Sequence, residues 1–169
     1  MSAQTFEMDT VQITSTLKDI PTFLGVYPSD LLPTSIHKTG TVIANADPHT
    51  REGSHWLAIH FEYPFSTAFY FDSYGRAPSV PDILSFIKRI SAIWAYNTSS
   101  LQGPTSVVCG HYCCLFTLYT DMDITPLQFV RLFTADAADR QAVQLFTAHF
   151  GTVCGTPRGG QCCKPSHKL

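Results

Sequence analysis

One apolar stretch limits the fold of this chain more than any other feature: it runs from Cys109 to about Asp121. The stretch is longer than a typical β-strand and predicts a buried helix. The chain has 169 residues, of which 44% are hydrophobic and 14% charged. That length and composition are typical of one compact domain with a sizeable core, and they argue against extensive disorder.

Two further segments predict strands. Residues 55–63 (HWLAIHFEY) and 67–74 (TAFYFDSY) are rich in aromatic and β-branched side chains, and a short turn joins them. Such a pair is typical of an antiparallel hairpin. A shorter apolar run at residues 41–44 predicts another buried strand.

The remaining segments predict helices and loops. Residues 10–24 have a weak helical pattern that Pro21 stops, and residues 79–97 predict an amphipathic helix with Ser79 as its N-cap. Two more helices are expected at 125–133 and 135–150, with loops at 25–40 and 98–108. We therefore expect one domain over residues 1–150 and a flexible tail over 151–169.

Charge and hydropathy exclude some function classes. The net charge is −2 and there is no Lys/Arg run, so composition gives no support for nucleic-acid binding. No apolar run approaches the roughly 20 residues of a membrane-spanning helix. The first residues do not resemble a secretory signal, which predicts an intracellular protein with its six cysteines as free thiols.

A zinc site in the tail is an alternative that would use four residues: Cys154, Cys162, Cys163 and His167.

Cys109 is a candidate nucleophile. A catalytic cysteine needs a base within hydrogen-bond reach, surroundings that favour the thiolate, and donors for the developing oxyanion. Cys109 begins the predicted buried helix, where the helix dipole favours a thiolate. Gln102, in the preceding loop, carries a side-chain amide that can donate to an oxyanion.

His55 and Asp72 are the candidate base and its orienting acid. His55 opens the first strand of the predicted hairpin, and Asp72 lies near the end of the second. If the strands are neighbours, both side chains can meet at one end of the sheet, where Asp72 would fix the imidazole tautomer. His60 and His111 are weaker base candidates, because they lie on other faces of their elements.

Each of these residues also has a plainer interpretation. A cysteine in an apolar helix is most often a small core residue. His55 can be a structural histidine, and Asp72 before Ser-Tyr-Gly can be an ordinary turn residue.

At these positions the sequence resembles the adenovirus-type endopeptidases (adenain), distant relatives of the SUMO and ubiquitin-like-protein proteases. That family combines a Gly-x-His-Trp block, an acidic residue after the next strand, and a Gln-Gly-Pro-x-Ser…Cys-Gly block. The matching segments here are residues 53–56 (GSHW), 71–75 (FDSYG), 101–110 (LQGPTSVVCG) and 111–116 (HYCCLF), with 23–27 (FLGVY) further upstream. The segments Tyr-Pro-Ser-Asp at 27–30 and Asn-Ala-Asp-Pro-His at 45–49 are similar to those of the endopeptidases carried by Polinton/Maverick elements and adintoviruses.

The resemblance implies a papain-like α+β fold, with a central mixed β-sheet flanked by helices. It implies a monomeric cysteine endopeptidase in which Cys109 is the nucleophile, His55 the base, Asp72 its orienter and Gln102 an oxyanion donor. Its protein substrates would be capsid or core precursors, cut at Gly-containing sites during virion maturation, in the virion and the host nucleus or cytoplasm.

Three departures from the adenoviral pattern matter. Asp72 replaces the Glu of many adenoviral enzymes, although Asp is common in the wider clan. Adenoviral enzymes are activated by a viral peptide that is joined to a cysteine upstream of the glutamine, whereas the first cysteine here is Cys109. An activating peptide or DNA is thus suggested by the resemblance without support from these residues, and we expect no required cofactor. The region after residue 120 is also shorter than in the adenoviral enzymes.

Other functions remain open. The same chemistry suits a deubiquitinase or SUMO-type isopeptidase acting on host conjugates. A catalytically silent binding module is a second alternative, although retention of all four site residues argues against it. Finally, residues 156–161 (TPRGGQ) resemble a cleavage site, which predicts self-cleavage after Gly160 as an alternative to a simple flexible tail.

Overall fold

A five-stranded mixed sheet organises the protein in the computed structural model, which describes residues 6–152. The strands are β1 (Phe23–Tyr27), β2 (Gly40–Asn45), β3 (Trp56–Glu62), β4 (Thr67–Phe71) and β5 (Ile93–Tyr96), and they lie in that order across the sheet. The three central strands are antiparallel, and each edge strand runs parallel to its neighbour. The hairpin predicted from β3 and β4 is therefore confirmed.

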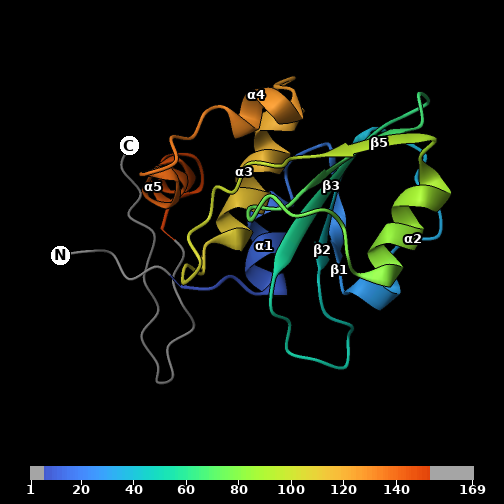
Figure 1. The fold of residues 1–169 in the computed structure, drawn as a ribbon, viewed down its shortest axis with the longest axis horizontal. Coiled ribbons are helices and arrows are strands. Elements are labelled where there is room, and N and C mark those ends of the chain that lie inside the picture. Colours follow the sequence, from blue (N-terminus) through green and yellow to red (C-terminus); the bar gives the residue numbers. More distant parts are fainter. Residues whose placement is uncertain (1–5, 153–169) are drawn as a thin grey trace.

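Helices cover both faces of this sheet (Figure 1). They are α1 (Thr10–Leu17), α2 (Pro81–Ile90), α3 (Cys109–Asp121), α4 (Pro126–Val130) and α5 (Ala138–Phe150), with a short 3₁₀ turn, η1, at Ser29–Leu31. In Figure 1, α2 lies on one side of the sheet, while α3 lies on the other with α1, α4 and α5 around it. None of the helices in the described residues has the length and apolar character needed to cross a bilayer.

Alternation along β3 creates two separate cores. Leu57 and Ile59 join the cluster that packs against α2, whereas Trp56 and Ala58 join the larger cluster around α3. Successive side chains of a strand point to opposite faces, so one strand supplies both cores. The near-continuous apolar character of this segment follows from that double burial.

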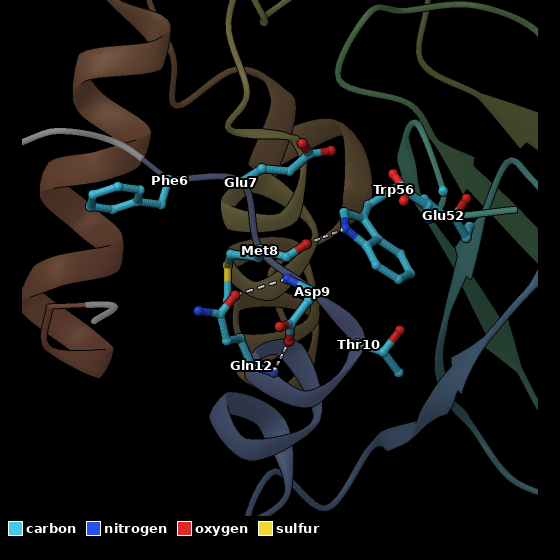
Figure 2. Close-up of a pocket in the computed structure, with 10 residues that line it drawn as sticks. Phe6, Glu7, Met8, Asp9, Thr10, Gln12, Glu52 and Trp56 are labelled. Atoms are coloured by element: carbon cyan, nitrogen blue, oxygen red, sulfur yellow. Dashed lines mark hydrogen bonds between the residues drawn. The ribbon is translucent and has the colours of Figure 1, made fainter. Parts of the chain in front are cut away.

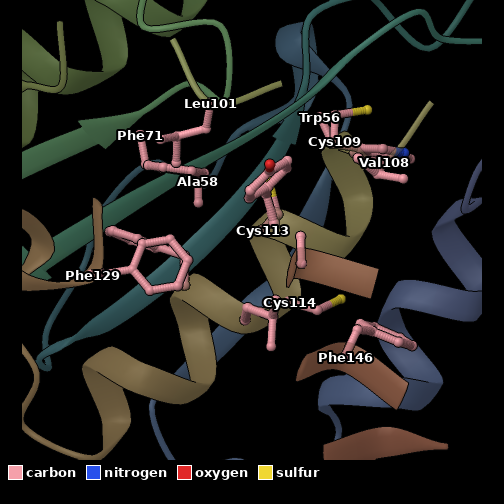
Figure 3. Packing of buried hydrophobic residues seen from close by; sticks show 14 of the residues in the cluster. Trp56, Ala58, Phe71, Leu101, Val108, Cys109, Cys113, Cys114, Phe129 and Phe146 are labelled. Atoms are coloured by element: carbon pink, nitrogen blue, oxygen red, sulfur yellow. The ribbon is translucent and has the colours of Figure 1, made fainter. Parts of the chain in front are cut away.

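Helix α3 is the buried helix that the apolar stretch predicts, and it has the predicted bounds. Figure 3 shows it enclosed by the sheet and by the neighbouring helices. Cys113, Cys114 and Phe116 are fully buried along it, and Phe116 stacks on Phe71 of β4 with ring centroids 4.9 Å apart. The helix is therefore fixed against the strand that ends next to the candidate active site.

Two predicted helices are wrong at their C-terminal ends. The first ends at Leu17, and residues 23–27 instead form β1, which pairs with β2. The second ends at Ile90, and Ile93 and Trp94 belong to β5. Its N-cap is Val80 and not Ser79. In both cases the segment forms backbone hydrogen bonds with the outer strand of the sheet, β2 or β4. The spacing of apolar residues within the segment does not reveal this pairing.

Smaller differences concern element ends. Helix α4 ends at Val130 rather than Phe133, and α5 begins at Ala138 rather than Ala135. Tyr74 lies in a turn after β4 and not in the strand. The expected α+β class with a mixed sheet between helices is confirmed, as is the position of Cys109 at the start of a buried helix. The predicted flexible tail, the zinc alternative and the Gly160 cleavage lie in residues 153–169, outside the described residues.

Candidate active site

His55 and Asp72 meet at one end of the sheet. His55 immediately precedes β3 and Asp72 immediately follows β4, and Ala58 pairs with Phe71 across these antiparallel strands. This register places the start of one strand beside the end of the other. His55 Nε2 lies 2.7 Å from Asp72 Oδ1, and the side chains are 16% and 5% exposed, respectively. The two residues thus form a shielded ion pair when His55 is protonated.

His55 also interacts with Cys109. Burial lowers the pKa of His55, but its hydrogen bond to Asp72 and the nearby Cys109 raise it more, so that the net pKa is about 9 instead of 6.5. Because Asp72 occupies Nε2, the ring nitrogen left for the Cys109 thiol is Nδ1. His55 therefore lies between an acid and a thiol, and it carries a proton at neutral pH.

The imidazole is also held through its ring face. The Tyr74 ring lies 4.8 Å from the His55 ring, and the Tyr74 backbone N–H donates to Asp72 Oδ1 at 2.9 Å. Arg76 in turn lies over the Tyr74 ring, 4.9 Å from its centroid. The turn after β4 therefore orients both members of the His55–Asp72 pair.

This turn depends on Gly75. Its φ is +68°, and a Cβ there would lie 2.6 Å from the backbone carbon of Ser99. Only glycine adopts this region without cost and also allows such a close approach of backbone. The glycine thus lets the segment before Gln102 pack directly against the Asp72 turn.

Cys109 is the first residue of α3 and is 3% exposed. Its neighbour Gly110 faces Met8, since a Cβ on Gly110 would lie 2.9 Å from Met8 Cβ. The Met8 carbonyl accepts a hydrogen bond from Trp56 Nε1 at 2.7 Å. The segment before α1 is therefore held across the start of α3.

Gln102 is buried, and its amide has a fixed orientation. Its Oε1 accepts from the Ser73 hydroxyl at 2.6 Å, and its Nε2 donates to the Ser106 carbonyl at 2.7 Å. A side-chain amide nitrogen has two N–H donors. The Ser106 carbonyl accepts from one of them, so the amide has a second N–H that can act as a donor.

Two residues of this site were not found from the sequence. Ser73 bonds Gln102 through its hydroxyl, and its carbonyl also accepts from the Gln102 backbone N–H at 2.9 Å. Asn97 holds Asp72 through two bonds: Asn97 Oδ1 accepts from the Asp72 N–H, and Asn97 Nδ2 donates to the Asp72 carbonyl. Only the position of Ser73 next to Asp72 could have pointed to Ser73 in the sequence. Nothing local points to Asn97, because it is 25 residues from Asp72.

The other sequence candidates lie elsewhere. His60 Nδ1 lies 3.0 Å from the Thr41 hydroxyl, and the His60 ring is edge-on to Phe116, near the middle of α3, with centroids 6.5 Å apart. His111 is buried against Phe146, and burial lowers its pKa to about 4. Within the described residues His111 Nδ1 has no hydrogen-bond partner. Burial raises the pKa of Cys113 and Cys114, so neither thiol is activated.

A cavity of about 610 Å³ lies beside the chain that leads into α1 (Figure 2). Trp56 and Met8 line it, and three acidic side chains surround it: Glu7, Asp9 and Glu52. Asp9 caps α1 by accepting from the Gln12 backbone N–H at 2.8 Å. Two residues of its wall are next to segments of the candidate site, since Met8 faces Gly110 and Trp56 follows His55 in the chain.

Known proteins share this sequence and fold. The protease of Human adenovirus B serotype 3 is 30% identical over 113 residues, which cover 57% of this chain and 53% of that protein. The protease of Bovine adenovirus 2 is 32% identical over 111 residues, with the same coverage of each chain. Over these residues the chain is similar to the adenovirus proteases. It spans about half the length of the relatives it matches, and no family model matches it.

The fold comparison agrees with the sequence comparison. The crystal structure of the ASFV protease superposes with a TM-score of 0.50 at 17% identity and covers 69% of this chain and 45% of that chain. The fold expected from the adenain resemblance is therefore confirmed. The Polinton or adintovirus subgroup stays a prediction.

Proposed function

We propose that this chain is a cysteine endopeptidase. Cys109 is its nucleophile, His55 its acid–base residue, Asp72 the orienter of His55, and Gln102 an oxyanion donor. One observation carries the proposal: His55 is hydrogen-bonded to Asp72 at 2.7 Å, and its pKa is also raised by Cys109, the first residue of a buried helix. The adenovirus homologues, which are named proteases, support the same activity.

The first half of the reaction forms an acyl-enzyme. The Cys109 thiolate attacks the scissile carbonyl carbon, and the carbonyl oxygen becomes an oxyanion. The Cys109 backbone N–H and the remaining Gln102 N–H donate to this oxyanion. The tetrahedral species collapses as the carbon–nitrogen bond breaks, and protonated His55 gives its proton to the leaving amine.

The second half releases the product acid. Neutral His55 takes a proton from water as the water attacks the thioester carbonyl. The oxyanion forms again at the same donors, and the carbon–sulfur bond then breaks to return the thiolate. The pKa of about 9 suits His55 for the first role, because it holds the proton at neutral pH until the amine needs it.

The substrates we propose are capsid or core precursor proteins of a virus or virus-like element, cut at Gly-containing sites during virion maturation. The similarity to proteases of adenoviruses supports a viral protease, and the precursor substrates are the further part of this proposal. Residues 1–150 act as one protease domain and as a monomer, in the virion and the host nucleus or cytoplasm. In this proposal the cavity lined by Trp56 and Met8 receives part of the peptide.

A cleavage-site profile with a Gly-rich peptide library tests this function. We expect cleavage after glycine by the wild-type chain and none by Cys109→Ala, which removes only the nucleophilic sulfur. Gln102→Ala is expected to lose about 10²–10³ in rate, as for other single oxyanion donors. Full activity of either variant would contradict the roles assigned here.

Two additions to that experiment separate the alternatives. Repeating the profile with and without DNA measures any cofactor requirement. A ubiquitin or SUMO vinylsulfone probe should label Cys109 poorly if precursor proteins are the substrates. Efficient labelling together with no peptide cleavage would favour the isopeptidase instead.

A further inference from the structure

Both oxygens of the Asp139 carboxylate are hydrogen-bonded to segments that carry proposed catalytic groups. Asp139 lies in the first turn of α5 and is half-buried. Its Oδ2 accepts from the Gly103 backbone N–H at 3.0 Å, and its Oδ1 accepts from the Tyr112 hydroxyl at 3.0 Å. Gly103 follows Gln102, and Tyr112 lies one turn after Cys109. One carboxylate thus connects the Gln102 loop, the nucleophile helix and α5.

The Gln102 loop is held from two sides. On the sheet side, the Ser73 carbonyl accepts from the backbone N–H groups of Leu101 and Gln102, at 2.8 and 2.9 Å. On the helix side, Asp139 is the acceptor for the next N–H, that of Gly103. Beyond the loop lies a cavity of about 520 Å³ that Gln102, Gly103 and Asp139 line. Without Asp139 this side of the loop would face open space and could move.

The carboxylate is well suited to this contact. Hydrogen bonds to an ionised acceptor are about twice as strong as neutral ones. A carboxylate in the first turn is also stabilised by the helix dipole. Tyr112 is fully buried and its ring packs 5.3 Å from that of Phe133, so the second partner of Asp139 is itself immobile. Gly103 leaves little room beside the carboxylate, since a Cβ there would lie 3.1 Å from Asp139 Oδ2.

We propose that Asp139 is a positioning residue of the oxyanion site: by anchoring the Gly103 N–H it fixes the Gln102 amide relative to Cys109. The proposal rests on the peptidase function above. Asp139 acts through Gln102 and touches no reacting atom. Its loss therefore weakens transition-state stabilisation, which lowers kcat and leaves the KM for peptide nearly unchanged.

Four variants of the full chain separate this role from a merely structural one. Asp139→Ala removes both hydrogen bonds, and we expect kcat to fall roughly tenfold, less than for direct loss of an oxyanion donor. Asp139→Asn keeps an acceptor for Gly103 and a donor for Tyr112, so it should restore most of kcat. Tyr112→Phe removes only the helix contact and should lower thermal stability with kcat retained. Asp136→Ala removes a carboxylate from the same cavity wall and should leave kcat unchanged.

Two measurements keep the test independent of the proposed activity. Hydrogen exchange of the Gly103 amide should be slow in the wild type and in Tyr112→Phe, and fast in Asp139→Ala. Alkylation of Cys109 by iodoacetamide builds no oxyanion, so its rate should be unchanged in Asp139→Ala. If no variant cleaves any peptide, the proposed function fails while Gly103 exchange still decides the anchor. Equal kcat losses in Asp139→Ala and Tyr112→Phe, or unchanged Gly103 exchange, would overturn the proposal.

Discussion

The Ser73 hydroxyl donates a 2.6 Å hydrogen bond to Gln102 Oε1. Ser73 is the residue directly after Asp72, and both it and Gln102 are buried. The short turn after β4 therefore orients the His55 imidazole through Asp72 and the Gln102 amide, the proposed oxyanion donor, through Ser73. Loss of the Ser73 hydroxyl is the simplest way to separate these two tasks.

Ser73→Ala should reduce turnover and stability together. The change leaves Gln102 Oε1 buried without its donor, which costs about 1–3 kcal/mol in the free energy of unfolding. The freed amide no longer points one N–H at the substrate oxygen, so kcat should fall roughly tenfold. Chemical denaturation and peptide cleavage measure the two effects.

The matched control for Ser73 is Ser91→Ala. Ser91 is also buried and donates a 2.6 Å bond, but to the Ile87 carbonyl at the end of α2. This variant should lose about 1 kcal/mol of stability and keep its kcat. A similar loss of kcat in both variants would show that general destabilisation, and not amide orientation, lowers activity.

The pH dependence should follow His55. Its pKa is raised to about 9, so the stability that its protonated form contributes is complete below pH 6.5 and is lost as the pH rises through about 9. Activity should also fall above pH 9, because neutral His55 cannot protonate the leaving amine. Asp72→Asn removes a partner that raises this pKa, so the alkaline limb of kcat should move to lower pH by about one unit or more.

The control for this pH shift is Asp121→Asn. Asp121 also accepts hydrogen bonds, from the Thr22 backbone N–H and hydroxyl, at the opposite end of α3 from Cys109. Its loss should leave the pH profile of kcat in place. An alkaline limb that stays near pH 9 in Asp72→Asn would refute the assignment of the limb to His55.

Asn97→Ala should loosen the backbone of Asp72, the proposed orienter of His55. The variant removes a 3.0 Å bond to the Asp72 N–H and a 2.7 Å bond to the Asp72 carbonyl, both buried. The Asp72 N–H loses its partner while the Asp72 carbonyl keeps the Gly75 N–H, so the free energy of unfolding should fall by about 1–3 kcal/mol. Turnover should fall as well, because Asp72 no longer holds His55 in place. Retention of wild-type kcat, measured at a temperature where the variant is folded, would exclude this support role.

Gly110→Ala tests the contact between the chain before α1 and the nucleophile helix. In an open helix this change would gain about 0.5–1 kcal/mol. Here the new Cβ would lie 2.9 Å from Met8 Cβ, and overpacking of this kind costs about 1–3 kcal/mol. The net effect should be destabilising, and displacement of Met8 should raise the KM for peptide. Thermal melts and steady-state kinetics test both, and a gain in stability would show that Met8 moves aside freely.

Local pattern alone was enough for α3 and for the central hairpin. The stretch from Cys109 is apolar on every face, and the segments around Trp56 and Phe71 carry strand-forming side chains, so burial and strand pairing both follow from short-range information. The same patterns, with the spacing of the family motif, pointed to four residues. The structure places two of them, His55 and Asp72, 2.7 Å apart.

Periodicity failed where a segment joins the sheet edge. Ile93 continues the three-and-four spacing of α2, yet it pairs with Thr67 of β4. Phe23 lies after Pro21 in a segment with no strand pattern, yet it pairs with Thr41 of β2. Both segments become strands because they form backbone hydrogen bonds with a strand that is distant in sequence. A pattern read over a short stretch of sequence does not include that partner.

The sequence by itself determined the buried helix, the hairpin and the candidate set of His55, Asp72, Gln102 and Cys109. Only the tertiary structure decided how that set is held. Ser73 reaches Gln102 across 29 residues, Asn97 reaches Asp72 across 25, and Asp139 reaches Gly103 across 36. These bonds join loops whose approach is set by the packing of α3, α5 and the sheet. Motif spacing identifies groups that can react, whereas long-range packing fixes their orientation.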